Sequence, residues 1–324
     1  MRQGTIVQYL ADYCWVELDP PEPQRRAPGP PQEVLARFRG RLELVMQQEE
    51  RHLREQREVE RIVAQQVAVG DRVALSEPKP GDFAVEEILP RETWLLRSSV
   101  GRYRHKPQCV VANADQLAVV VAPVPGFSLG TVDRCFLAAI QGGLEPILIV
   151  NKLDLDPRLP ERLETKTYAE MGYRVFFTSA LLDQGLAALG PALADKYTAF
   201  CGHSGVGKSS LLRRLTGVDI AVRSVHAPTG RGRHGTSSAR LYHLPSGGEV
   251  VDTPGIREFG LAHLTWLDVH EYFSDIAALT SGCSFRDCSH TVEPDCAVRR
   301  ATEEGRLALK RLESYVKLRA ECSS

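Results

Sequence analysis

The sequence predicts an α/β fold in which a parallel sheet stands between a small β-barrel and a short helical tail. Short alternating strands dominate residues 1–110, whereas unbroken apolar runs separated by helical segments dominate residues 111–275. Unbroken apolar strands are typical of a parallel sheet that helices cover on both faces. Three of the eight cysteines crowd together in the last segment, residues 276–324. We therefore predict three domains with these boundaries.

Composition limits the classes of function. The chain has 324 residues, a net charge of -1 and 43% hydrophobic residues, so it lacks a global basic field for nucleic acid. Any RNA contact must come from local patches. The sequence has no apolar run of about 18 residues, so no membrane span is predicted, and the N-terminus lacks a signal-peptide pattern. We expect a cytoplasmic location and cysteines that are thiols or metal ligands rather than disulfides.

The first domain reads as a barrel of the OB-fold type. Period-two alternation in TIVQYLADYCWVEL, at 5–18, predicts antiparallel strands. Further strand-like pieces are DRVALSE (71–77), FAVEEILP (83–90) and TWLLRSS (93–99). Several short strands that end near residue 110 favour a small barrel. Residues 45–66, rich in Glu, Gln and Arg with Leu and Val at helical spacing, predict a helical insertion, most simply a solvated charged hairpin.

The middle domain carries the strands of the parallel sheet. The apolar runs DQLAVVVAPV (115–124), EPILIV (145–150), YRVFFTS (173–179) and YTAFCG (197–202) each predict one strand. SARLYHLPSGGEVVD, at 238–252, predicts two more strands joined by a glycine-containing turn.

A phosphate-binding loop follows the fourth of these strands. GHSGVGKS matches the pattern G-x-x-x-x-G-K-[ST]. A predicted strand before it and a predicted helix after it argue against a chance match. Lys208 is expected to neutralise the terminal phosphates, and the Ser209 hydroxyl to hold Mg²⁺. The residues predicted to line the phosphate site are Gly202, Ser204, Gly205, Val206, Gly207, Lys208, Ser209 and Ser210.

A second phosphate-site motif is EVVDTPG. Asp252 at the end of its strand would act on Mg²⁺ through a water, and the Gly255 amide would face the γ-phosphate. Such a turn is common by itself, but its place after a phosphate loop makes it informative.

A guanine reader lies upstream, in NKLDLD. Asp154 would accept hydrogen bonds from guanine N1–H and the 2-amino group, a donor pair that adenine lacks. Lys152 would lie over the base, Asn151 would fix the loop, and backbone N–H groups of Ser179 and Ala180 in TSA would meet guanine O6. The motif alone fits equally well a helix start capped by Asp154. The phosphate motifs downstream favour the base reader.

The order of the motifs indicates a circular permutation. The base reader and TSA precede the phosphate loop and DTPG, yet ligands bind where the carboxyl ends of parallel strands meet, whatever the chain order. Domain termini often lie close together, so a permuted chain can build the same site. We infer a circularly permuted P-loop GTPase domain. The segment after DTPG then leads directly into the C-terminal domain, to which a switch movement would be passed.

The tail carries a zinc signature. Cys283, Cys288, His290 and Cys296 have the spacing C-x4-C-x-H-x5-C. Three thiolates and an imidazole fill a tetrahedral shell with no open position, so the zinc would be structural. A tail this short cannot easily build its own core, and a metal would supply the missing stability. The alternative is four buried residues without a ligand.

Together these motifs resemble the RsgA (YjeQ) family of circularly permuted bacterial GTPases. VAVGDRV and ILPRETWLLR resemble the family's OB-fold, ANADQLAVVVAP its entry into the GTPase domain, GRHGTS (232–237) its switch I, and CSFRDCSHTVEPDCAV its zinc module. The resemblance implies GTP hydrolysis stimulated by the 30S ribosomal subunit, a role in late maturation of that subunit and release on hydrolysis. It also implies GTP/GDP, Mg²⁺ and Zn²⁺ as cofactors and 16S rRNA as a partner. We expect a monomer.

The switch departs from the family pattern, in which Gly-Arg-His precedes three threonines. Here Gly235, Thr236 and Ser237 follow His234, and Thr236 keeps the hydroxyl expected to contact Mg²⁺ and the γ-phosphate.

Catalysis should be slow without a partner. Ile256, after the DTPG glycine, has no polar atom with which to orient the attacking water, as the Gln of Ras-like enzymes does. His234 is the candidate for that role beside Lys208 and Thr236, although contact with rRNA or solvent is an equal alternative. A nucleotide-gated scaffold that hardly hydrolyses GTP is the competing function.

Three basic patches are candidates for rRNA contact, although each alone is better explained as a solvated face. They consist of Arg97, Arg102, Tyr103, Arg104, His105 and Lys106; of Arg231 and Arg233; and of Arg299, Arg300, Lys310 and Arg311.

Overall fold

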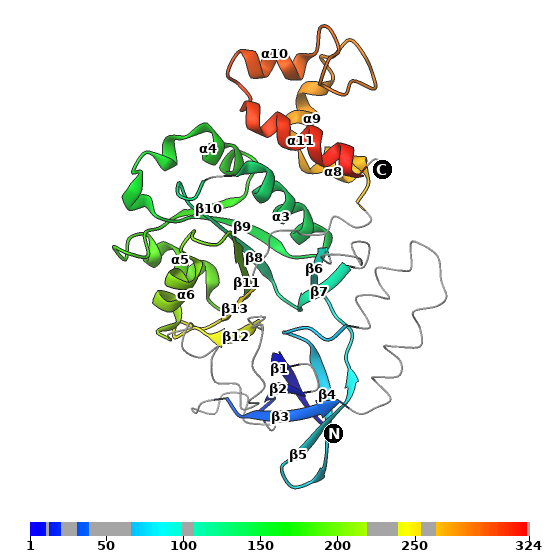
Figure 1. Ribbon diagram of the computed structural model, residues 1–324, viewed down its shortest axis with the longest axis vertical. Coiled ribbons are helices and arrows are strands. Elements are labelled where there is room, and N and C mark those ends of the chain that lie inside the picture. Colours follow the sequence, from blue (N-terminus) through cyan, green and yellow to red (C-terminus); the bar gives the residue numbers. More distant parts are fainter. Residues whose placement is uncertain are drawn as a thin grey trace.

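The chain forms three parts in a row, a barrel, a sheet covered by helices, and a helical C-terminal domain (Figure 1). This computed structural model describes residues 1–10, 13–20, 31–38, 66–98, 107–126, 128–218, 239–253 and 264–322. The helix predicted at 45–66 lies outside these ranges except for its last residue. Within them, no helix has both the length and the apolarity to cross a membrane.

The N-terminal part is a five-stranded barrel. Its strands are β1 (Arg2–Leu10), β2 (Tyr13–Leu18), β3 (Glu33–Phe38), β4 (Arg72–Lys79) and β5 (Asp82–Ile88). They pair in the order β1-β2-β3-β5-β4, and β4 pairs back onto β1 to close the barrel. Along β2 every second residue is buried, as the alternation of the sequence predicts. Ile6, Val16, Leu75 and Val85 fill the interior.

One predicted barrel strand belongs elsewhere. Strand β6 (Trp94–Ser98) forms over TWLLRSS, but it pairs with β7 (Pro107–Ala112) in a separate two-stranded sheet. The reason is burial. Leu95 and Val111 of this hairpin are fully buried in the main core beside α3 (Leu129–Gln141), not in the barrel.

The central sheet is parallel except for one strand. Its order is β10-β9-β8-β11-β13-β12, and only β12 runs antiparallel to its neighbours. The strands are β8 (Gln116–Val121), β9 (Glu145–Val150), β10 (Arg174–Phe177), β11 (Tyr197–Gly202), β12 (Arg240–His243) and β13 (Glu249–Asp252). The five parallel strands therefore end at one edge, where the predicted motifs follow them.

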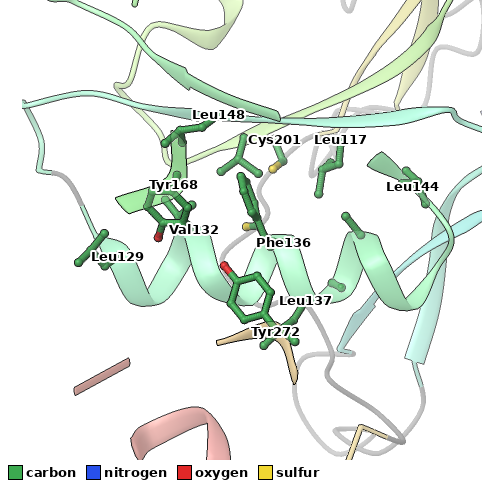
Figure 2. Close-up of a cluster of buried hydrophobic side chains, with 14 of the residues drawn as sticks. Leu117, Leu129, Val132, Phe136, Leu137, Leu144, Leu148, Tyr168, Cys201 and Tyr272 are labelled. Atoms are coloured by element: carbon green, nitrogen blue, oxygen red, sulfur yellow. The ribbon is translucent and has the colours of Figure 1, made fainter. Parts of the chain in front are cut away.

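Helices cover both faces of this sheet. Besides α3 they are α4 (Leu163–Glu170), α5 (Leu186–Leu193) and α6 (Lys208–Thr216), with two 3-10 turns, η2 (Leu153–Leu155) and η3 (Leu159–Glu161). Side chains of β8 alternate between the two faces, since Leu117 joins the cluster under α3 and Ala118 the cluster under α5 and α6. Figure 2 shows Phe136 of α3 directed at the strands that carry Leu117 and Leu148.

The barrel joins the central sheet through β12. Strand β1 pairs with β12 at Gln8 and Arg240, so one sheet of 11 strands runs through both domains. Arg240 donates to Gln8 at 2.7 Å and to both carboxylate oxygens of Glu33 at 2.9 and 2.8 Å. His243 lies with Nε2 2.7 Å from Glu17 and Nδ1 3.5 Å from Glu249. The strand that follows the predicted switch is thus fixed to the barrel.

The C-terminal domain docks on α3 through a buried ion pair. Its helices are α8 (Trp266–Tyr272), α9 (Ser274–Thr280), α10 (Ala297–Glu303) and α11 (Leu309–Cys322). Asp133 of α3 and Arg311 of α11 form an ion pair in which both side chains are almost completely buried. The same Asp133 oxygen accepts from the hydroxyls of Tyr168 at 2.8 Å and Tyr272 at 2.9 Å. One carboxylate on α3 therefore joins three other helices, α4, α8 and α11, to it.

Arg311 is consequently not part of a basic surface, and its assignment to an rRNA-contact patch was wrong. Its guanidinium also donates to Asp275 at 3.0 and 3.1 Å and lies 3.9 Å from the centre of the Phe273 ring. Its neighbour Lys310 is exposed.

Replacing Arg311 should destabilise the chain strongly. Arg311→Met leaves Asp133 as a buried charge without its cation, so we expect a loss of about 3–5 kcal/mol in unfolding free energy. The loss is measured by chemical denaturation, with tryptophan fluorescence as the signal. Lys310→Met, at the exposed neighbouring position, should change stability by less than about 0.5 kcal/mol. Equal losses in the two variants would contradict a structural role for the buried pair.

The barrel junction should depend on pH through His243. The hydrogen bond with Glu17 raises the pKa of His243, aided by the charges of Glu249 and Glu33 and opposed by burial. The folded chain thus holds this proton more tightly than the unfolded chain. The stabilisation is complete below the ordinary pKa of about 6.5 and is lost as pH rises through the raised value.

We therefore expect His243→Gln to destabilise the protein more at pH 6 than at pH 9, as measured by thermal unfolding of both forms. Arg240→Gln is the matched control at the same junction, because a guanidinium does not titrate in this range. Its effect should be similar at the two pH values. A His243→Gln effect that does not change with pH argues against an ion pair there.

Candidate nucleotide-binding site and metal cluster

The phosphate-loop glycines have backbone conformations that other residues rarely adopt. Gly202, Gly205 and Gly207 have φ values of 154°, 86° and 91°. A side chain at Gly207 would place its Cβ 2.4 Å from Nδ2 of Asn151. Glycine therefore allows the loop backbone to approach the NKLD segment closely. Helix α6 begins at once with Lys208, so the loop ends at a helix N-terminus.

Asn151 joins three motifs that are far apart in sequence. Its side chain is buried, and Nδ2 donates to the carbonyl of Val206 in the phosphate loop at 3.0 Å. Its Oδ1 accepts from the Thr178 hydroxyl at 3.1 Å and from the Ala180 N–H at 3.2 Å. The NKLD segment, TSA and the phosphate loop are thereby held as one unit.

The other two residues of the predicted base reader lie beside this unit. The Ser179 hydroxyl donates to the carboxylate of Asp154. Lys152 donates from Nζ to the carbonyl of Val124 at 3.0 Å. The side chains of Asp154 and Ser179 thus meet from different strand ends.

The amides expected to meet guanine O6 are partly engaged within the chain. The N–H of Ser179 donates to the carbonyl of Gln184 at 2.9 Å, so it is already engaged. Ser179 contacts Asp154 through its hydroxyl. The N–H of Ala180 makes the longer bond to Asn151 already described. Among the residues that the structure describes, the next amide, of Leu181, has no hydrogen-bond partner. That amide is therefore not engaged by the described part of the chain.

The phosphate loop and the DTPG segment meet through Lys208 and Asp252, which form an ion pair. Nζ of Lys208 also donates to the carbonyl of Thr253 at 3.3 Å, and the Thr253 hydroxyl donates to Phe200 at 2.6 Å. The predicted phosphate cation and magnesium carboxylate are therefore neighbours. The side chains of Ser204, Ser209 and Ser210 are exposed beside them.

Several predicted residues lie outside the described part of the chain, so their positions are not discussed. They are Arg102, Tyr103, Arg104, His105, Lys106, Arg231, Arg233, His234, Gly235, Thr236, Ser237, Gly255 and Ile256.

The four predicted zinc ligands converge in the C-terminal domain. Cys283 Sγ lies 3.7 Å from His290 Nδ1 and 3.9 Å from Cys296 Sγ, and His290 Nδ1 lies 3.3 Å from Cys296 Sγ. With Cys288, the four ligand atoms all lie within 4.8 Å of one another. Tetrahedral zinc with bonds of about 2.3 Å separates its sulfur ligands by about 3.8 Å. The cluster fits a zinc ion.

The local electrostatics suit metal ligation. Burial and the nearby Arg319 lower the pKa of His290, which keeps its ring neutral. Burial raises the pKa of the Cys288 thiol to about 12, so a cation is needed to hold it as a thiolate. Burial acts the same way on Cys283, but hydrogen bonds from the amides of Ala297 and Val298 lower the pKa of that thiol overall.

A second group of ligand-type side chains is Glu17, His243 and Glu249 at the barrel junction. Their geometry is that of ion pairs. The two ring nitrogens of His243 face different carboxylates, which suits an imidazolium that donates from both nitrogens.

Two contacts to the site have no signal in the motifs. Thr131 of α3 lies 3.4 Å from His203 of the phosphate loop, between Oγ1 and Nε2. Arg214 of α6 donates from Nε to the carbonyl of Ala180 at 3.2 Å. Both come from helix residues with no motif of their own.

Comparison with solved structures supports the fold and the permutation. YjeQ from Thermotoga maritima matches over 99% of this chain and 98% of its own, with 29% identity and a TM-score of 0.65. YloQ, described as a circularly permuted GTPase, matches over 99% of this chain and 95% of its own, with 27% identity and a TM-score of 0.62. The predicted fold class, a permuted GTPase domain with an N-terminal barrel, is confirmed.

Sequence comparisons agree. Residues 88–262, more than half of the chain, match the family model of the RsgA GTPase. Two proteins called small ribosomal subunit biogenesis GTPase RsgA illustrate the relatives. That of Ectopseudomonas mendocina (strain ymp) is 41% identical over 77% of this chain and 73% of its own length. That of Chlorobaculum tepidum is 38% identical over 78% of this chain and 84% of its own. These matches show that the chain is a GTPase of the RsgA family.

Proposed function

We propose that this GTPase binds the 30S ribosomal subunit, acts in its late maturation, and leaves it after a GTP hydrolysis that the subunit stimulates. One observation carries the proposal. The side chains proposed to read the base and to bind phosphate meet at one sheet edge, tied together by Asn151, in a chain whose relatives are named for small-subunit biogenesis. A cytoplasmic monomer that contacts 16S rRNA is part of the proposal.

Guanine is read by Asp154 and by the turn after β10. Asp154 accepts from guanine N1–H and the 2-amino group, and Lys152 covers the base. Backbone N–H groups of the turn after TSA donate to O6, foremost that of Leu181, because those of Ser179 and Ala180 are engaged by Gln184 and Asn151. Adenine offers Asp154 no donor pair, so its binding leaves the carboxylate without a hydrogen bond from the base. The Ser179 hydroxyl, which already bonds Asp154, holds that carboxylate in place.

With phosphates and Mg²⁺ bound, Lys208 and Asp252 would exchange their ion pair for contacts to these groups. Lys208 turns to the terminal phosphates, which the loop backbone and the exposed Ser204 and Ser210 line. Ser209 and Asp252 are a hydroxyl and a carboxylate, the oxygen donors that Mg²⁺ prefers, with Asp252 acting through a water. Mg²⁺ supplies charge neutralisation between the β- and γ-phosphates when bound.

Switch residues complete the site. Thr236 contributes its hydroxyl to Mg²⁺ and the γ-phosphate, and Gly255 its amide to the γ-phosphate. His234 orients the attacking water, because Ile256 has no polar atom for the task. Catalysis then depends on how a partner places the switch, which makes hydrolysis slow in isolation and fast on the ribosome.

Zinc bound by Cys283, Cys288, His290 and Cys296 stabilises the C-terminal domain without taking part in the reaction. The fit of the cluster to tetrahedral geometry supports this. The exposed Arg300 and Lys310 remain candidates for rRNA contact, whereas Arg299 is partly used to hold the carbonyl of Glu293 at 3.2 Å.

The ribosomal role is tested by GTP turnover of the purified chain with and without purified 30S subunits. We expect turnover to rise about tenfold or more with 30S for GTP, and no rise for ATP. Lys208→Ala, which removes the phosphate cation, should abolish the rise and so exclude GTPases carried by the subunits. Tight GTP binding with no stimulation would contradict the proposal and favour a nucleotide-gated scaffold.

The metal proposal is tested by zinc content. The purified chain should hold about one zinc per molecule, and Cys288→Ser should lose it together with thermal stability of the C-terminal domain. Cys322→Ser is the matched control, because this half-buried thiol in the same domain is not among the four ligands. Retention of zinc by Cys288→Ser, or its loss from Cys322→Ser, speaks against the assigned cluster.

A further inference from the structure

One helix reaches both halves of the nucleotide site. Helix α6 begins with Lys208 at the phosphate loop, and its last turn carries Arg214. Nε of Arg214 donates to the carbonyl of Ala180 at 3.2 Å and lies 3.2 Å from Oδ1 of Asp183. The phosphate-binding helix is thus tied to the turn that follows TSA.

That turn has little else to hold it on its outer side. Residues Ser179 and Gln184 close it with two backbone hydrogen bonds of 2.9 and 3.1 Å. Leu181 and Leu182 at its tip are 73% and 62% exposed, so they add little packing, and the N–H of Leu182 donates to the Ser179 hydroxyl at 3.2 Å. Asp183, at φ 53°, has a left-handed backbone. The direction of the amides in this turn therefore depends on its hydrogen-bonded ties.

Arg214 holds the peptide group between Ala180 and Leu181. The carbonyl of Ala180 and the N–H of Leu181 belong to the same peptide plane, and in a trans peptide they point in opposite directions. A guanidinium that holds the carbonyl fixes the direction of the amide on the other side. On the near side, the Ala180 N–H is held by Asn151.

We propose that Arg214 is a positioning residue for guanine recognition, which holds the Ala180–Leu181 peptide so that the amides of the turn face guanine O6. The inference rests on the proposed guanine reader and adds to it a residue outside its motifs. Arg214 does not contact the nucleotide itself.

A basic residue in the last turn of a helix also interacts with the helix dipole, which is the competing explanation. Arg213 distinguishes the positioning role from the helix-dipole explanation. It lies in the same turn, carries the same charge and is exposed, and in the described part of the chain its guanidinium makes no hydrogen bond or ion pair. Any effect of helix charge should appear equally when Arg213 is replaced.

The experiment measures the affinities of the full-length chain for GDP, IDP and ADP by competition with a fluorescent GDP. The variants are Arg214→Gln and Arg213→Gln, which each remove one charge and keep a good helix former. We expect Arg214→Gln to weaken GDP about three- to tenfold, the effect of one hydrogen bond. IDP, which keeps O6 and lacks the 2-amino group read by Asp154, should weaken by the same factor. ADP, without O6, should not change.

Three results would overturn the role of Arg214: unchanged GDP affinity, an equal loss for ADP, or the same loss in Arg213→Gln. Should Arg214→Gln not fold, Arg214→Lys keeps the charge without the Nε donor and is judged by the same GDP-to-ADP ratio. A wild-type chain that binds ADP as well as GDP would instead overturn the guanine reader itself, whatever the variants do.

Discussion

The buried carboxamide of Asn151 is the interaction on which the nucleotide site depends. The permuted chain brings its motifs to one edge from separate strand ends, and packing of the sheet alone does not fix loops to within hydrogen-bond distance. Asn151 does so by donating to the phosphate loop and accepting from TSA. Because Gly207 has no Cβ, the loop comes close enough for this bond. The same bonds serve in either chain order, which is why permutation leaves the site intact.

From this centre, connections run to both flanking domains. Strand β13 ends at Asp252 and pairs with β12, whose Arg240 and His243 are bound to barrel carboxylates. On the other side, α3 carries Thr131 beside the phosphate loop and Asp133 in the ion pair with the C-terminal domain. Figure 2 shows the segment that bears Tyr272 on the side of α3 away from the sheet. The helix therefore lies between nucleotide site and C-terminal domain.

Motifs and apolar runs predicted most of this arrangement, because each depends on residues that are near one another in sequence. The strands at 116–121 and 145–150, the phosphate loop and the zinc spacing are of this kind. What sequence could not show depends on tertiary partners. TWLLRSS has the alternation of a barrel strand, yet its Leu95 is buried in the main core.

Arg311 is the clearest case of the same limit. In KRLESYVK it looks like one more cation on a solvated helix, and only the position of Asp133, 178 residues away, makes it a buried partner. Arg214 likewise stands beside Arg213 with nothing local to distinguish the two. Counts of basic residues therefore overstate the basic surface of this chain. Arginines paired with carboxylates must be left out before the candidate rRNA-contact patches are compared.

The ion pair of Lys208 and Asp252 connects chemistry with movement. A phosphate that attracts Lys208 would leave Asp252 without its cation, and Asp252 would then be available to hold Mg²⁺ through a water. Both residues are largely buried, so neither charge is well screened by water. Asp252 also ends the strand whose continuation, through DTPG, leads to α8 and Tyr272. We expect the C-terminal domain to sense the change in charge at this pair, because the chain runs from Asp252 through DTPG directly into that domain. The segment after NKLDLD reaches the domain only through side chains of α4, such as Tyr168, which bonds Asp133.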